Sequence, residues 1–221
     1  MSFTEVPLVL LGAGGTARES IDLVDALIEV GSSYRIVAAL DDDSSLAGSR
    51  IRGIEIVGPL TNARNYPIET LFVDTLGSPR NYSRRPGIVG ALGLPASRFV
   101  TLVHPRASVS ASASIGPGSL VFAFGIVGAG VRLGSHVTIL PHGTVSHDAI
   151  VGDWTQIATG AIVSGAAHVG LCCYIGAGAT LIDGAQVGDG SLVGMGSVVL
   201  NEVPPGVIVA GNPARILRTM L

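Results

Sequence analysis

The chain has 221 residues, of which 48% are hydrophobic and 13% are charged, and its formal net charge is -3. This composition supports a sizeable core in one large or two small domains and excludes a disordered chain. The cations are scattered arginines without a single lysine, so we expect no nucleic-acid partner and no Schiff-base or P-loop lysine. No apolar run approaches the ~18 residues of a membrane span and no signal-peptide pattern opens the chain. The sequence therefore predicts a soluble cytoplasmic protein without a membrane partner.

The first residues indicate a strand followed by a helix. An apolar run over residues 6–11 ends in a glycine-rich turn that contains Gly14 and Gly15. Helical spacing of apolar residues then extends over residues 16–30, with Thr16 as the expected N-cap.

Two further strands are expected before residue 100. The first covers residues 36–40 and stops at Asp41 and Asp42, and the second covers residues 71–76 and stops at Gly77. A helix is expected over residues 80–92. This alternation predicts a small parallel sheet in an α/β, Rossmann-like domain over residues 1–100.

A six-residue repeat governs the rest of the chain. Every sixth residue from Val103 to Val199 is aliphatic, which gives 17 positions without an exception. This hexapeptide repeat is typical of a left-handed parallel β-helix, in which three short strands make a coil of about 18 residues and the aliphatic side chains point inward. We expect this fold over residues 101–221, with a short C-terminal tail. Glycines recur directly after the aliphatic residue, where we expect corners with unusual backbone angles: Gly116, Gly134, Gly152, Gly170 and Gly188.

One histidine of the repeat is a candidate for chemistry. The neighbours of His147 one coil away are Ala129 and Gly165, which leave room for a ligand beside an imidazole. Asp148 follows it, and such a carboxylate can fix the tautomer of the ring and raise its basicity. Adjacent residues of a strand face opposite ways, so this pairing requires a corner. A solvent-facing position is expected for three others: His104, His136 and His168.

Two segments resemble a known family. They are the run from His147 to Asp153 and the Val-Ile-Val-Ala-Gly-Asn-Pro-Ala run that ends at Ala214. Both are similar to bacterial nucleotide-sugar acetyltransferases, a group that acts on UDP-amino sugars, perosamine-type GDP sugars and sialic acid. The resemblance also includes the glycine-rich first turn, the acidic end of the second strand and the hexapeptide repeat, so it covers nearly the whole chain. It implies His147 as the general base, Asp148 as its orienting partner, acetyl-CoA as the co-substrate, no metal, and a homotrimer with sites between subunits.

The same resemblance assigns one substrate to each domain. The sugar nucleotide would contact a set of residues at the carboxyl ends of the N-terminal strands: Gly14, Gly15, Thr16, Asp41, Asp42 and Gly77. The CoA would contact residues of the β-helix and its tail: Gln156, Gly165, Ala177, Met195, Asn212 and Arg215. Three positions depart from the family pattern: Thr16 and Gln156 stand where relatives have histidine, and Leu140 where many have asparagine. The sugar and the acceptor atom therefore stay open.

Alternative functions follow from other features of the sequence. N-acetylation is the expected reaction, and O-acetylation of a sugar such as sialic acid is its alternative. His142 and His147 have the spacing of a zinc site of the γ-carbonic-anhydrase type, but Arg106 stands where a third ligand would be needed. Gly12-x-Gly14-x-x-Ala17 is a weak match to NAD-binding turns. A scaffold without catalysis is the remaining possibility.

Overall fold

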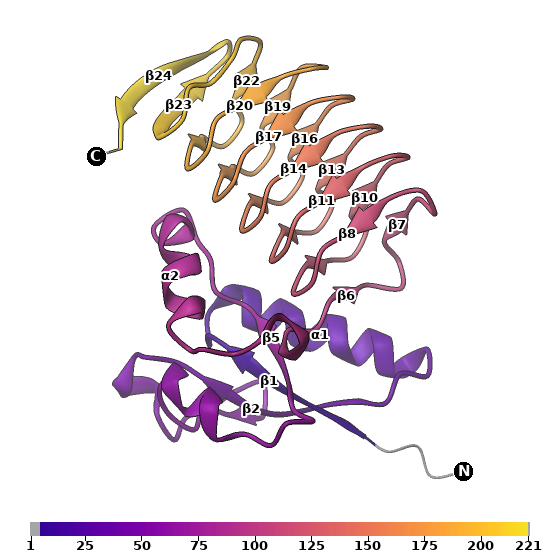
Figure 1. The fold of residues 1–221 in the computed structure, drawn as a ribbon, viewed down its shortest axis with the longest axis vertical. Coiled ribbons are helices and arrows are strands. Elements are labelled where there is room, and N and C mark those ends of the chain that lie inside the picture. The colour runs from indigo at the N-terminus through magenta and orange to yellow at the C-terminus, as the bar shows by residue number, and fades with distance from the viewer. Residues whose placement is uncertain (1–4, 221) are drawn as a thin grey trace.

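The computed structural model describes residues 5–220, so residues 1–4 and 221 of the expected domains lie outside the described residues. An α/β part forms one end of the molecule and a solenoid rises from it toward the C-terminus (Figure 1). The α/β part contains a parallel sheet in the order β2-β1-β5. Its strands are β1 (Val6–Leu11), β2 (Tyr34–Leu40) and β5 (Leu71–Asp74).

Helices cover both faces of this sheet. Helix α1 (Gly15–Glu29) and the first two coils of the solenoid share one buried cluster with the sheet, which includes Leu8 and Leu10. Helix α2 (Arg85–Gly90) and the 3₁₀ helix η2 (Leu60–Asn65) contribute to the cluster on the other face, which includes Phe72. The N-terminal strands are therefore enclosed, as parallel strands require.

Several local expectations for this part were wrong. Gly14, not Thr16, precedes the first turn of α1, since the chain already enters the helix at Gly15. The helix expected over residues 80–92 is divided into the 3₁₀ helix η3 (Tyr82–Arg84) and the short α2, with Pro86 in the first turn of α2, where proline is tolerated. A hairpin and three 3₁₀ helices of this part were not predicted: β3 (Arg50–Ile51), β4 (Ile54–Glu55), η1 (Ser44–Leu46), η2 and η4 (Ala96–Arg98).

The C-terminal part is a parallel β-solenoid of the left-handed type with about six turns. The first face contains β6 (Leu102–Val103), β9 (Leu120–Val121), β12 (Thr138–Ile139), β15 (Gln156–Ile157), β18 (Tyr174–Ile175), β21 (Leu192–Val193), β23 (Val207–Gly211) and β24 (Ala214–Thr219). The second contains β7 (Ser108–Val109), β10 (Ile126–Val127), β13 (Thr144–Val145), β16 (Ile162–Val163), β19 (Thr180–Leu181) and β22 (Val198–Val199). The third contains β8 (Ser114–Ile115), β11 (Arg132–Leu133), β14 (Ile150–Val151), β17 (His168–Val169) and β20 (Gln186–Val187).

The register of the solenoid confirms the predicted coil length. Val127 pairs with Val145, and Val145 pairs with Val163, so equivalent residues of neighbouring coils are 18 apart. These side chains are at most 1% exposed and form the core of the solenoid. Strands β23 and β24 then form an antiparallel hairpin that covers the far end.

The predicted role of the recurrent glycines was wrong. The left-handed backbone occurs two residues later, for example at His136 and Trp154, where φ is 56° and 65°. The glycines are needed because adjacent coils approach closely. A Cβ at Gly152 would lie 2.6 Å from the carbonyl carbon of Gly170. Within residues 5–220 no helix is both long and apolar enough to span a membrane.

Candidate functional site

His147 and Asp148 lie at a corner of the solenoid that follows β13. Asp148 has a φ of 59°, and its backbone N–H donates to the carbonyl of Ala129 in the previous coil at 2.8 Å. This left-handed residue bends the chain, so the two adjacent side chains meet. His147 Nδ1 lies 3.1 Å from Asp148 Oδ2. The corner that the pairing requires is thus present.

The imidazole of His147 is open to solvent and fits closely against the next coil. Its side chain is 68% exposed, and that of Asp148 is 71% exposed. A Cβ at Gly165 would lie 2.5 Å from Nε2 of His147, so only glycine leaves the ring this position. When Nδ1 donates to a carboxylate, Nε2 carries a lone pair that can accept a proton. The arrangement therefore suits a general base.

The other residues predicted to contact CoA lie apart from this corner in the single chain. Ala177 and Met195 line a hollow together with Pro79 and Tyr174. Met195 is 78% exposed. Asn212 lies in the turn of the hairpin that closes the solenoid, Arg215 lies near the start of its second strand, β24, and both residues are exposed.

Gln156 is buried against the α/β part, a position that its sequence neighbourhood did not predict. Nine residues are half a coil, so Gln156 lies on β15, on a different face from the strand before His147. Its side chain is 1% exposed and contacts Gly77, where no Cβ would fit. The structure thus brings together Gly77, predicted to contact the sugar nucleotide, and Gln156, predicted to contact CoA. Within one chain, Gln156 and His147 lie on different sides of the solenoid.

The residues predicted for the sugar nucleotide gather at one edge of the parallel sheet. Around Gly14 and Gly15, at the start of α1, a Cβ would meet no atom within 4 Å, and Thr16 follows in the first turn. Asp41 accepts a hydrogen bond from Ala13 N–H at 2.8 Å, and Asp42 accepts one from the backbone of η2 at 2.9 Å. Asp41 therefore holds the turn that follows β1, and Asp42 holds the start of η2, in addition to the predicted contact of both with the sugar nucleotide. Gly77, three residues beyond the end of β5, has a φ of 135°.

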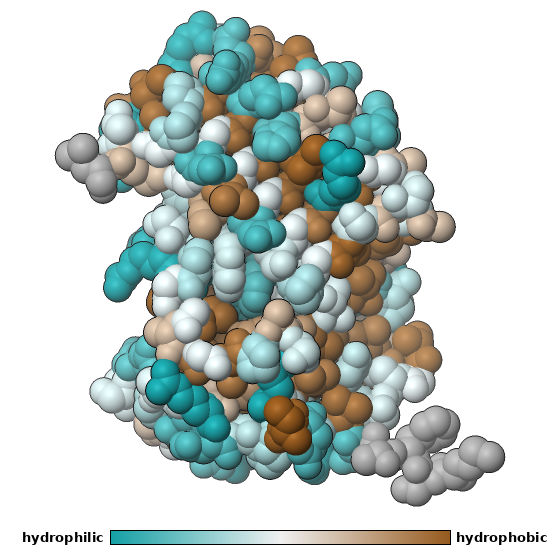
Figure 2. All heavy atoms as spheres, viewed as in Figure 1, coloured by the Kyte–Doolittle hydropathy of each residue, from teal (hydrophilic) through white to brown (hydrophobic). Residues whose placement is uncertain are grey.

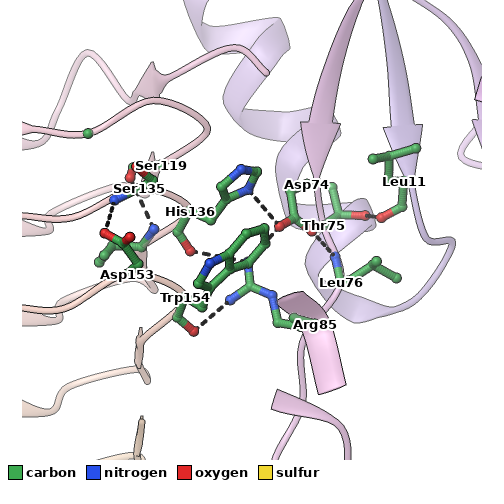
Figure 3. Close-up of polar contacts among 12 residues, drawn as sticks. Leu11, Asp74, Thr75, Leu76, Arg85, Ser119, Ser135, His136, Asp153 and Trp154 are labelled. Atoms are coloured by element: carbon green, nitrogen blue, oxygen red, sulfur yellow. Dashed lines mark hydrogen bonds and ion pairs between the residues drawn. The ribbon is translucent and has the colours of Figure 1, made fainter. Parts of the chain in front are cut away.

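A buried charged cluster beside this edge was missed. His136 was expected to face solvent but is 6% exposed, because the α/β part covers its corner of the solenoid. Its ring stacks on Trp154 at 3.9 Å, and Nδ1 lies 3.0 Å from Asp74 Oδ2 (Figure 3). Arg85 Nη2 donates to the same oxygen at 2.9 Å. One sequence signal was available: Gly118, one coil before His136, leaves room for a large ring, as Gly165 does for His147.

The environment of Asp74 keeps it ionised. Burial raises the pKa of its carboxyl group, but the charge of Arg85 and the hydrogen bonds from His136 and Arg85 outweigh burial and hold the pKa below its ordinary value.

Elsewhere, the ring of His142 stacks on Phe124 at 5.1 Å. Within the described part of the chain, no three His, Cys, Asp or Glu side chains group as metal ligands.

Comparisons with known sequences identify sugar acetyltransferases as relatives, although no family model matches the chain. UDP-N-acetylbacillosamine N-acetyltransferase from Bacillus subtilis (strain 168) is 33% identical over 117 residues, which are 52% of this chain and 51% of that protein. GDP-perosamine N-acetyltransferase from Escherichia coli O157:H7 is 28% identical over 147 residues, which are 66% of this chain and 64% of that protein. The chain thus matches about half to two thirds of the length of these curated relatives.

Solved structures match nearly the whole chain. The acetyltransferase domain of PglB from Neisseria gonorrhoeae FA1090 has a TM-score of 0.85 and 33% identity, and the match covers 96% of this chain and 100% of that one. The same domain in complex with acetyl coenzyme A has a TM-score of 0.84, 34% identity, and coverage of 97% and 100%. PerB from Caulobacter crescentus, in complex with CoA and GDP-perosamine, shares the fold with a TM-score of 0.80 at 24% identity, over 99% of this chain and 100% of that one. Through these relatives and its solenoid, the chain belongs to the nucleotide-sugar acetyltransferase family.

Proposed function

We propose that the protein transfers the acetyl group of acetyl-CoA to the amino group of a nucleotide-linked sugar. The observation that carries this proposal is the solvent-open pair of His147 and Asp148, held at 3.1 Å by a left-handed corner. The names of the curated relatives support an amino acceptor, since both are N-acetyltransferases. The complex of the PglB domain with acetyl coenzyme A supports the donor.

The proposed mechanism is direct transfer with His147 as the general base. The neutral amine of the sugar attacks the thioester carbonyl, and Nε2 of His147 removes a proton from that nitrogen as the carbon–nitrogen bond forms. Collapse of the tetrahedral intermediate forms the amide and breaks the carbon–sulfur bond, and the imidazolium returns a proton to the CoA thiolate. Asp148 keeps Nδ1 protonated and stabilises the imidazolium while it exists. Backbone N–H groups would stabilise the oxyanion.

The two substrates are assigned to the two parts of the molecule. The nucleotide would bind where the strands of the parallel sheet end, with its phosphates at the open start of α1 near Gly14 and Gly15. The CoA would follow the solenoid along the hollow that Ala177 and Met195 help to form. Asn212 and Arg215 are proposed for its nucleotide end.

A homotrimer with sites between subunits is part of the proposal. Apolar side chains stay exposed on one side of the solenoid, to the right in Figure 2. Ile126 and Ile162, on the face that also contains β13, are 43% and 39% exposed. Burying this row against another subunit would remove apolar surface from water and place a second solenoid beside the first. The cytoplasm, where acetyl-CoA is available, is the proposed location.

A turnover assay with a matched variant tests the function. Purified protein is mixed with acetyl-CoA and a panel of UDP-, GDP- and dTDP-linked sugars that carry either an amino or only hydroxyl groups, and free thiol is followed. We expect turnover with one or more amino sugars. His147→Ala should lower kcat by about 10²–10⁴-fold. His168→Ala, a control at another exposed histidine of the solenoid, should leave kcat unchanged.

Three outcomes would contradict the proposal. One is the absence of turnover on the whole panel together with no thermal stabilisation by any of the nucleotides. Another is a His147→Ala variant as active as the wild type. Turnover on hydroxyl sugars alone would replace N-acetylation by O-acetylation.

A further inference from the structure

Three buried side chains and one partly buried side chain join the α/β part to the solenoid. We call them the Asp74 cluster: Asp74, Arg85, His136 and the partly buried Trp154. Asp74 is the last residue of β5, and Arg85 is the first residue of α2. His136 and Trp154 occupy the same corner of two successive coils, 18 residues apart. Figure 3 shows the four side chains pointing toward one another between the sheet and the coils.

Arg85 is the central member of the Asp74 cluster. Its side chain is completely buried and donates to Asp74 Oδ2 at 2.9 Å. It also donates to the backbone carbonyls of His136 and Trp154, each at 3.2 Å. A guanidinium has donors in a fixed plane and can satisfy three acceptors at once, whereas the ammonium of lysine is a compact charge without that geometry. Arg85 therefore fixes α2 and β5 to two coils simultaneously.

The Asp74 cluster connects directly to the edge proposed for the sugar nucleotide. Thr75, the next residue, donates from its hydroxyl to the carbonyl of Leu11 at 2.7 Å and approaches that of Gly12 at 3.1 Å, where β1 ends. Gly77 follows and contacts Gln156 of the solenoid. A rotation of the α/β part against the solenoid would therefore move the strand ends themselves.

Stability alone is a weak reason for this arrangement. A buried ion pair loses most of its Coulomb energy to desolvation, and well-packed apolar residues often serve as well. The directional hydrogen bonds of Arg85 specify how the α/β part is oriented on the solenoid, and apolar contacts, which are not directional, specify that orientation less strictly.

We propose that Arg85 is a positioning residue for the transfer reaction: with Asp74 and His136 it sets the orientation in which the α/β part presents the sugar nucleotide to the acetyl-transfer site on the solenoid. This inference rests on the proposed function. It requires that the α/β part binds the nucleotide and the solenoid binds acetyl-CoA independently of each other. Arg85 then affects only the rate of transfer between the two bound substrates.

The test compares three variants. Arg85→Lys keeps the charge and loses the planar donors. The double variant Asp74→Asn/Arg85→Met removes both charges, so that no buried charge is left unpaired if Arg85→Lys fails to fold. Arg84→Lys is the control, since the neighbouring Arg84 is exposed. The measurements are nucleotide affinity by calorimetry, KM for acetyl-CoA, kcat with the nucleotide-linked amino sugar, transfer to the free amino sugar at high concentration, and scanning calorimetry.

We expect a selective loss. In Arg85→Lys and in the double variant, kcat with the nucleotide-linked sugar should fall about 10–100-fold, the range that follows from a misplacement of about 1 Å. Nucleotide affinity, KM for acetyl-CoA and transfer to the free sugar should stay as in the wild type, and Arg84→Lys should match the wild type throughout. The single unfolding transition of the wild type should divide into two in the double variant.

Two results would overturn the inference. Wild-type kcat in both Arg85 variants, with one unfolding transition, would show that Arg85 does not position the α/β part. A parallel loss of nucleotide affinity, acetyl-CoA affinity and transfer to the free sugar would show a general structural role instead. If the wild type acetylates no nucleotide-linked sugar, the proposed function fails, and the calorimetric comparison still reports whether Arg85 couples the two parts.

Discussion

Replacing Gly165 by alanine is expected to disable His147 while the solenoid stays folded. The new Cβ would lie 2.5 Å from Nε2 and 2.6 Å from Cε1 of the imidazole. Non-bonded carbon atoms prefer about 3.5 Å, so the ring must move by about 1 Å. The ring is exposed and can rotate into solvent, but doing so breaks the contact between Nδ1 and Asp148.

The size of the effect follows from this displacement. A reacting group misplaced by about 1 Å costs about 10²-fold in rate, or about 2.7 kcal/mol of barrier. The rotated side chain costs only about 0.5–1.5 kcal/mol of stability. We therefore expect kcat/KM of Gly165→Ala to fall about 100-fold, with a small change in Tm.

Steady-state kinetics with acetyl-CoA and the preferred nucleotide-linked sugar, together with thermal unfolding, check this prediction. Gly90→Ala is the matched control, because a Cβ at Gly90 meets no atom within 4 Å. Calorimetric titration with CoA shows whether Gly165→Ala acts through the cofactor instead of through His147. An unchanged kcat/KM in Gly165→Ala would refute the assigned geometry of the general base.

Three further results are expected. Burial raises the pKa of the Cys173 thiol to about 11, so iodoacetamide at pH 8 should leave Cys173 unmodified until the protein is denatured, as peptide mass spectrometry can show; rapid labelling would contradict this. Ile157 is fully buried between Ile139 and Ile175, and Ile157→Ala should lower the free energy of unfolding by about 2–5 kcal/mol in urea titrations, whereas a loss below about 1 kcal/mol would argue against a close-packed core. The pKa of Asp74 lies below its unfolded value of about 3.9, so its stabilising contribution is complete above that value and is lost as the pH falls through the lower folded pKa. Asp74→Asn should therefore cost about 3–5 kcal/mol at pH 7 and progressively less below about pH 4, and a gap that does not change with pH would contradict the ionised assignment.

The solenoid could be predicted from the sequence because its contacts repeat. Each coil packs on residues 18 positions away, so the interval that is visible in the sequence is also the spatial register. The same register identified the small neighbours of His147. The parallel strands of the α/β part were predicted because their apolar runs are local, whereas the hairpin formed by β3 and β4 was missed because each of its strands has only two residues.

Contacts between the two parts could not be predicted in this way. The repeat determines which residues point inward and which of them stack, but it does not show which corner another part of the chain will cover. His136 and His147 both stand in the solenoid beside small residues, yet one is buried and the other is exposed. The difference comes from Asp74, 62 residues before His136, and from Arg85 beside it. The sequence by itself thus determined the solenoid, its register and the candidate base, whereas only the tertiary structure decided that the α/β part covers His136 and leaves His147 open.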